Sequence, residues 1–313
     1  MKFYKLLFRS AAMLALSGTL VLTSCSDDDD PGPVPNPTVV GVAQSDTNFS
    51  ILVAALQKAN LVTTLSNTSA NFTVFAPTNT AFRNAGITAA AIAAFTPAEV
   101  NNVLTPILTY HVLGAKVNAS GVPVSDTVKT VNGKNIFASK NPNGVFVNGV
   151  KVTSADINAS NGVVHVIGSV LMPPTKSIAQ IVTDDPTRFS LLLTAVVRAG
   201  LAGTLSGPGK FTVFAPVNSG FPAALDTDAE INAAPVATVA GIVGSHAFAT
   251  NIFAGDLTAG NTGATVNPAT TLTIGLTPPT VKITGSGMAA SNITTTNIVA
   301  TNGVIHIIDK VLQ

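Results

Sequence analysis

The chain has 313 residues, and at roughly 150 residues per domain this length favours two domains, each large enough to bury a core. Only 10% of the residues are charged and 46% are hydrophobic, which excludes a disordered polymer. No run of Lys or Arg occurs, Trp is absent and aromatic residues make up 5%, so the composition argues against nucleic-acid binding through phosphate contacts or base stacking.

The N-terminus has the pattern of a secretion signal. Three basic residues precede an apolar run at 11–22, and small residues follow it up to Cys25. The run is short for a bilayer span, and no later uncharged stretch of about 18 strongly apolar residues follows. We expect residues 1–24 to be a removable signal peptide. Without its three bases, the remaining chain carries two more acids than bases.

The residues around the only cysteine resemble the lipobox of bacterial lipoproteins. Leu22-Thr23-Ser24-Cys25 matches that motif, which implies that Cys25 becomes the lipid-modified first residue of the mature chain. A plain signal peptide with an incidental cysteine is the alternative. With a single cysteine, an intramolecular disulfide is excluded in either case.

Residues 25–40 have the composition of a tether. The acidic run at 27–30 resembles the export tag of surface lipoproteins from Bacteroidetes-type bacteria, and a solvated spacer is the alternative. The Pro-rich residues 31–37 predict an extended, semi-rigid segment. Together these features predict a protein attached to the outer membrane by acyl chains and facing the cell exterior.

The rest of the chain contains one unit twice. Phe72-Thr-Val-Phe-Ala-Pro77 recurs as Phe211-Thr-Val-Phe-Ala-Pro216, and Asn161-Gly-Val-Val-His-Val-Ile recurs as Asn302-Gly-Val-Ile-His-Ile-Ile. The offsets are 139 and 141 residues, so the two copies align over their whole length. The repeat predicts two domains, at 41–174 and 175–313, joined at Pro173-Pro174.

In chain order, each unit begins with helical patterns. Apolar residues at helical spacing predict a helix over 50–59, and the apolar run 72–75 predicts a buried strand. Thr96-Pro97-Ala98-Glu99 matches a capping box with Pro at the first helical position, which predicts a helix reaching Tyr110.

Strand patterns dominate the second half of each unit. Residues 145–152 alternate around Asn148-Gly149, a pair that favours a two-residue hairpin turn. The continuous apolar run at 162–172 predicts a strand buried on both faces. We therefore expect an α+β fold in each unit.

Three ordered motifs in each unit resemble the fasciclin-like domains. They are Phe72–Phe82, Tyr110-His111-Val-Leu113 and 161–173 in the first copy, with counterparts at Phe211–Phe221, Ser245-His246-Ala-Phe248 and 302–312. The resemblance implies a β-sandwich or wedge of about seven strands with a layer of short helices. It also implies an extracellular adhesion module, with Tyr110 and His111 as candidate adhesion residues. The second copy departs from the motif at Ser245, and the first departs at Gly168, where the second carries Asp309.

The remaining recurrent polar residues are interpreted as structural. His165, His246 and His306 lack the clustered partners that zinc binding or nucleophilic catalysis requires, so we expect hydrogen-bonded histidines in or beside the sheet. Asn79 and Asn218 follow a strand end and are expected to cap the next turn. The sequence predicts no catalytic, cofactor-binding or metal site. Asp126-Thr127-Val128 resembles an O-glycosylation acceptor.

These observations favour a lipid-anchored surface protein that binds an extracellular protein or glycan and performs no catalysis. The alternative is an accessory lipoprotein that presents a solute or polysaccharide to an outer-membrane uptake system. The sequence predicts partners of two kinds, the membrane through the N-terminal lipid and one extracellular ligand, and no nucleic acid. It leaves weak self-association, the identity of the ligand and the domain that binds it open.

Overall fold

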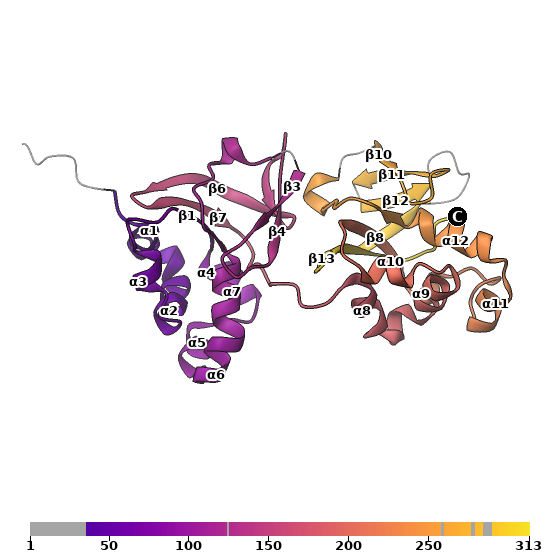
Figure 1. Ribbon diagram of the computed structural model, residues 1–313, viewed down its shortest axis with the longest axis horizontal. Coiled ribbons are helices and arrows are strands. Elements are labelled where there is room, and N and C mark those ends of the chain that lie inside the picture. Colours follow the sequence, from indigo (N-terminus) through magenta and orange to yellow (C-terminus); the bar gives the residue numbers. More distant parts are fainter. Residues whose placement is uncertain (1–35, 124, 258–259, 277–278, 284–289) are drawn as a thin grey trace, which may run out of the picture. The chain divides into compact units, whose positions relative to one another are not determined.

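The computed structural model describes residues 36–123, 125–257, 260–276, 279–283 and 290–313. The predicted signal peptide, Cys25 and the acidic run lie outside the described residues. From residue 36 onward, the described chain contains two copies of one α+β fold, the first coloured indigo to magenta and the second red to yellow in Figure 1. The predicted fold class is confirmed.

In the first repeat, short helices surround the first strand and the other strands come late. Helix α2 occupies the predicted position, and the predicted helix from 97 to 110 consists of three pieces with a π-helical turn in the middle. The helical elements are α1 (Val39–Ser45), η1 (Thr47–Phe49), α2 (Ser50–Lys58), α3 (Val62–Leu65), α4 (Asn79–Asn84), α5 (Ala89–Ala94), α6 (Pro97–Glu99), η2 (Val100–Leu104), α7 (Thr105–Tyr110) and η3 (Ala119–Gly121). The strands are β1 (Phe72–Pro77), β2 (Val112–Leu113), β3 (Ser125–Lys129), β4 (Asn135–Asn141), β5 (Gly144–Val147), β6 (Val150–Ala159) and β7 (Gly162–Ile167).

These strands form one seven-stranded sheet in the order β2-β1-β7-β6-β5-β4-β3. Strands β1 and β7 are parallel, with Phe72 opposite Gly162 and Pro77 opposite Ile167, and the other pairs are antiparallel. Gly162 is required at the start of β7, because a Cβ there would lie 2.0 Å from the Phe72 carbonyl oxygen. The glycine that begins the closing strand recurs as Gly303 for the same steric reason, because a Cβ there would lie 2.0 Å from the Phe211 carbonyl oxygen.

Apolar side chains cover both faces of this sheet. On one face, α1 and α2 bury Val39, Leu52 and Leu56 in a cluster that includes Val74 of β1 and Val164 of β7. On the other face, the sheet curls so that residues of β4 and β5 join the cluster around β1 and β7. The members of that second cluster include Phe75, Tyr110, Ile136, Val147 and Ile167.

The second repeat has the same order of elements. Its helical elements are α8 (Ile178–Thr183), α9 (Pro186–Arg198), α10 (Ala202–Ser206), η4 (Asn218–Gly220), α11 (Asp228–Ala233), α12 (Val236–Ser245) and η5 (Ala254–Asp256). Its strands are β8 (Phe211–Pro216), β9 (Ala247–Phe248), β10 (Gly260–Ala264), β11 (Thr271–Leu276), β12 (Pro279–Ile283), β13 (Ser291–Ala300) and β14 (Gly303–Ile308). The sheet order is β10-β11-β12-β13-β14-β8-β9, and β8 and β14 are parallel. The second sheet thus repeats the topology of the first.

The predicted hairpin turn joins β5 and β6. Asn148 and Gly149 have φ values of 48° and 74°, the left-handed conformation that suits this pair. The closing strand β7 is buried at five of its six positions. In the described ranges, no single helix is long and apolar enough to cross a membrane. One bent pair, Val39–Ser45 with Thr47–Lys58, meets the length and composition limits only when taken together.

Candidate functional site

Tyr110, a candidate adhesion residue in the sequence, lies in the interior. Its side chain is fully buried, and its hydroxyl donates to the Asn135 carbonyl oxygen and accepts from Asn148 Nδ2, each at 2.9 Å. Burial raises the pKa of this hydroxyl to about 12, although the bond from Asn148 favours the ionised form. The expectation that Tyr110 contacts a partner is not supported, because its side chain fastens α7 to the β4 and β5 hairpin.

His111 is also buried, and the same holds for its counterpart His246. His111 Nδ1 pairs with the Ile107 carbonyl oxygen at 2.8 Å, and Nε2 accepts from the Leu171 amide at 2.9 Å. His246 makes the equivalent contacts with Ile242 and Leu312. Burial lowers the pKa of both histidines to about 4, so each ring is neutral near pH 7. These rings attach the end of a helix to the segment after the closing strand, and no surface role for His111 is supported.

The other two histidines lie in the closing strands. His165 Nε2 pairs with the Val117 carbonyl oxygen at 2.9 Å, and its Nδ1 accepts from the Asp156 amide at 3.2 Å. His306 makes the same pair of contacts with Ile252 and Asn297. Asp156 and Asn297 have positive φ values and lie where the register of β6 and β13 shifts, so each histidine supports a bulge.

Asn79 and Asn218 bond to backbone amides of other helices, and not to the turns that they were expected to cap. Asn79 Oδ1 accepts from the Ile51 amide at 2.9 Å, and Asn218 Oδ1 accepts from the Leu191 amide at 3.1 Å. The cap of α4 is the preceding residue, Thr78, because its hydroxyl is the group that reaches the Ala81 amide. The asparagines therefore attach α2 and α9 to the residues that follow a strand.

Sequence reasoning missed the role of Asn161 and Asn302. The buried Asn161 accepts from the Val39 amide and donates to the carbonyl oxygens of Leu65 and Asn67, with distances of 2.8 to 3.0 Å. Asn302 repeats all three bonds in the second domain. Since both residues precede a glycine in a motif that recurs, the repeat itself was the signal that could have revealed them.

The two repeats touch through a joint between the β4 and β5 hairpin and η5. The rings of Phe137 and Phe253 stack with centroids 5.0 Å apart, and both side chains are buried. Ser139 donates a hydrogen bond to Asp256, and Asn141 Nδ2 donates to the Gly255 carbonyl oxygen at 2.7 Å. Burial raises the pKa of Asp256, although hydrogen bonds from Ser139 and Asn141 oppose the shift.

Two glycines allow this close approach. A Cβ at Gly149 would lie 2.6 Å from Asn297 Nδ2 and 2.9 Å from Phe253 Cβ. A Cβ at Gly255 would lie 2.4 Å from the Phe146 ring. At the edge of the joint, Lys210 Nζ pairs with Asp126 Oδ1 at 3.1 Å, an exposed contact that contributes little to stability. Thr127, the predicted glycosylation residue, is half-buried beside this ion pair, and its modification stays a prediction.

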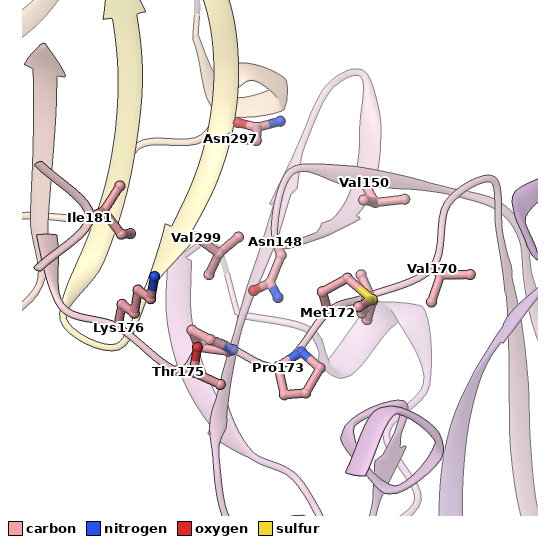
Figure 2. A pocket seen from close by; sticks show the side chains of 12 residues that line it. Asn148, Val150, Val170, Met172, Pro173, Thr175, Lys176, Ile181, Asn297 and Val299 are labelled. Carbon is pink, nitrogen blue, oxygen red and sulfur yellow. The ribbon is translucent and has the colours of Figure 1, made fainter. Parts of the chain in front are cut away.

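A pocket of about 350 Å³ lies beside the joint and is the candidate functional site. Figure 2 shows the side chains of Asn148, Val299, Thr175 and Met172 around it. The linker forms one wall, and side chains from the β5–β6 turn, α8 and β13 complete it. The lining residues are Asn148, Val150, Val170, Leu171, Met172, Pro173, Pro174, Thr175, Lys176, Ile181, Asn297 and Val299.

The chemistry of this pocket suits binding. Asn148 is held in place because its Oδ1 accepts from the Phe137 amide at 2.8 Å while its Nδ2 bonds to Tyr110. Met172 is 55% exposed and offers a flexible apolar contact. Lys176 Nζ pairs with Asp184 at 2.7 Å, and both side chains remain about half exposed. The pocket thus combines apolar walls, amide groups and one lysine.

Comparison with known proteins gives the family. The family model described as "Fasciclin domain" matches residues 47–173 and 187–313. The chain therefore belongs to the fasciclin domain family, with two domains in tandem. Fasciclin domains are found in cell adhesion proteins.

Relatives span bacteria and mammals. Protein sll1483 of Synechocystis sp. is 43% identical over 137 residues, which cover 44% of this chain and 74% of that protein. Transforming growth factor-beta-induced protein ig-h3 of Sus scrofa is 32% identical over 247 residues, covering 77% of this chain and 34% of ig-h3. This chain thus spans about a third of ig-h3. The solved FAS1 domain pair of the insect cell adhesion molecule fasciclin I is 20% identical, with a TM-score of 0.37 over 83% of this chain and 92% of that one.

Proposed function

We propose that this protein is a cell-surface adhesion or binding protein that contacts a protein or glycan through its tandem fasciclin domains. The observation that carries the proposal is the pair of fasciclin domains in one chain, because fasciclin domains are found in cell adhesion proteins. The pocket beside the joint supports it, since apolar side chains next to amide groups suit the mixed surface of a peptide or sugar.

The proposal includes a lipid anchor at Cys25 and a position on the outer membrane, facing the exterior. The lipobox-like sequence, the acidic run and the Pro-rich tether support this part. A tethered pair of domains also gains avidity when two weak contacts form on one surface, because the second contact is intramolecular.

The proposed activity is binding without catalysis. Both ring nitrogens of each of the four histidines have a hydrogen-bonding partner in the fold, so none offers a free base to a substrate. In the described part of the chain, no group of three or more His, Cys, Asp or Glu side chains could hold a metal ion. These contacts favour a binding role over hydrolysis.

A deletion experiment tests the adhesive role. Cells that display the full chain are compared with cells that display a chain lacking residues 41–313, on surfaces coated with matrix proteins and glycans. We expect the deletion to reduce attachment several-fold. Unchanged attachment on every surface would contradict the proposal, and saturable binding of a free oligosaccharide without attachment would favour the uptake-accessory alternative.

A Cys25→Ala variant tests the anchor separately. We expect the variant to leave the membrane fraction and appear as soluble protein, while a Cys25→Ala chain fused to an unrelated lipoprotein signal returns to the membrane. Retention of Cys25→Ala in the membrane fraction would contradict lipid anchoring.

A further inference from the structure

The second repeat contains an apolar cavity, separate from the pocket beside the joint. It has a volume of about 130 Å³ and lies among α8, α9, α10, α12 and β8, elements that Figure 1 shows in the second repeat. Buried Ile178, Val182, Leu192, Leu205 and Val213 form much of its wall. Engineered apolar cavities of similar size, about 150 Å³, stay dry and bind benzene or xenon.

The polar residues around this cavity have their polar atoms bonded elsewhere. The hydroxyl groups of Thr183 and Ser206 donate to carbonyl oxygens of their own helices, at 2.8 and 2.7 Å. The ring nitrogens of His246 are bonded to Ile242 and Leu312. Because a buried water needs two to four polar partners, the cavity favours a hydrocarbon over water.

The first repeat shows how the cavity arises. Matching hydrogen bonds align the two repeats residue by residue around this region. Ala202 and Ala247 line the cavity where the first repeat has Val62 and Val112. Ala179, Val196 and Val243 likewise stand where the first repeat has Val40, Leu56 and Leu108, whereas Ile178, Val182 and Leu193 are larger than Val39, Ala43 and Val53.

In sum, these eight apolar exchanges give the cavity walls of the second repeat four fewer side-chain carbon atoms than their counterparts in the first. An unfilled space of this kind weakens a fold, because its walls lose packing contacts. An apolar occupant restores those contacts. The half-buried Ala179, Leu193 and Ala202 place one side of the cavity near the protein surface.

We propose that this cavity is a binding site for a compact hydrocarbon group of about six carbon atoms, either a small free molecule or the end of an alkyl chain. The site does not depend on the adhesive role, because its lining residues come only from the second repeat. A hydrocarbon ring of this size fills the volume, and no charged side chain lines the cavity.

The test uses the full chain with benzene and, in a parallel arm, octanoate. Thermal unfolding and the methyl NMR signals of the valine and leucine residues are followed as ligand is added. We expect the unfolding midpoint of the second repeat to rise by about 3 to 6 °C at roughly ten times the Kd. The methyl signals of Val182, Leu192 and Val213 should shift at the same time. The arm that responds identifies the free molecule or the alkyl end as the occupant.

Filling the cavity provides the decisive comparison. Ala202→Val and Ala247→Val introduce the side chains of the first repeat, and each is expected to abolish the ligand-dependent shifts. Ala179→Val serves if either variant fails to fold. Val62→Ala, the mirror change in the first repeat, must keep the response of the second. The absence of any response to both ligands in the wild type, or an equal response in the filled variants, would overturn the proposal.

Discussion

The two repeats bind their helix ends to the sheet in different ways. In the first, the Tyr110 hydroxyl crosses to the backbone of Asn135 and to Asn148. In the second, the Ser245 hydroxyl donates to Gly241 of its own helix and accepts from Asn267 and Thr270. The long Tyr110 side chain thus extends to its partners, whereas the short Ser245 hydroxyl accepts from side chains that extend to it. Both repeats therefore have a hydrogen-bonded hydroxyl group at this position, although the residue type differs.

The segment after the closing strand differs as well. Asp309 of the second repeat accepts hydrogen bonds from Ser291 and Asn292, whereas the first repeat has Gly168 at this position. Burial alone would raise the pKa of Asp309, but the hydrogen bonds from Asn292 and Ser291 outweigh it and the pKa is lowered. By contrast, the asparagine and histidine contacts are the same in both repeats. The side-chain bonds to backbone groups are therefore the same in both repeats, whereas neighbouring side chains differ in size.

Acid should lower the stability of the fold through its buried histidines, and this is the largest effect of the series. Burial lowers the pKa of His246 and His306 in the second repeat, and of His111 in the first, to about 4. An unfolded histidine takes up its proton near pH 6.5, so the contribution to stability is present above that pH and falls as the pH drops towards 4. The loss approaches roughly 3 kcal/mol per histidine. Hydrogen exchange of the β14 amides should show this loss as the pH falls from 6.5 to 4.

The control for this prediction is His306→Gln, which removes one titrating ring. Its stability should depend less steeply on pH between 6.5 and 4 than that of the wild type. Equal slopes in the variant and the wild type would show that His306 does not carry the effect.

Removing Asn161 or its counterpart Asn302 should lower the free energy of unfolding of each repeat by about the same amount. Asn161→Ala leaves the Val39 amide and the carbonyl oxygens of Leu65 and Asn67 without their partner, and we expect a loss of about 4 kcal/mol. Asn302→Ala should produce a matching loss confined to the second repeat. Urea unfolding measures both. A loss below 1 kcal/mol in either variant would contradict the role assigned to this residue.

The Phe253→Ala substitution should weaken the joint between the repeats. The variant removes a buried ring that stacks on Phe137, and we expect a loss of about 3 kcal/mol with weaker protection of β4 amides in the first repeat. Phe248→Ala is the matched control, since Phe248 is buried inside the second repeat. If both variants leave β4 equally protected, the stack does not couple the repeats.

The two hydroxyl groups that differ between the repeats should give the smallest effects of this series. Tyr110→Phe leaves Asn148 Nδ2 without its partner, so we expect a loss of about 2 kcal/mol in the first repeat. Ser245→Ala in the second repeat should cost about 1 kcal/mol, because that hydroxyl also bonds within its own helix. Denaturant midpoints compare the two variants, and a larger loss in Ser245→Ala would reverse the predicted order.

Much of the fold follows from the sequence because the signals are local. The helical spacing over 50–59, the Asn148-Gly149 turn and the apolar run of the closing strand each lie in one short segment. The repeat then gives the number of domains. The site is different, since Asn161 bonds to residues 94 to 122 positions away and the joint pairs Phe137 with Phe253. Such contacts leave no local pattern, and the burial of Tyr110 and His111 was likewise visible only in the folded chain.

The central claim is that the paired domains bind an extracellular partner beside their joint. Binding of residues 25–313 to a panel of matrix proteins and glycans tests it most directly, with Met172→Asp as the variant in the pocket. We predict that at least one partner binds, and that Met172→Asp weakens this binding at least tenfold while leaving the unfolding midpoint unchanged. Failure to bind any partner, or equal binding by the variant, would contradict the account.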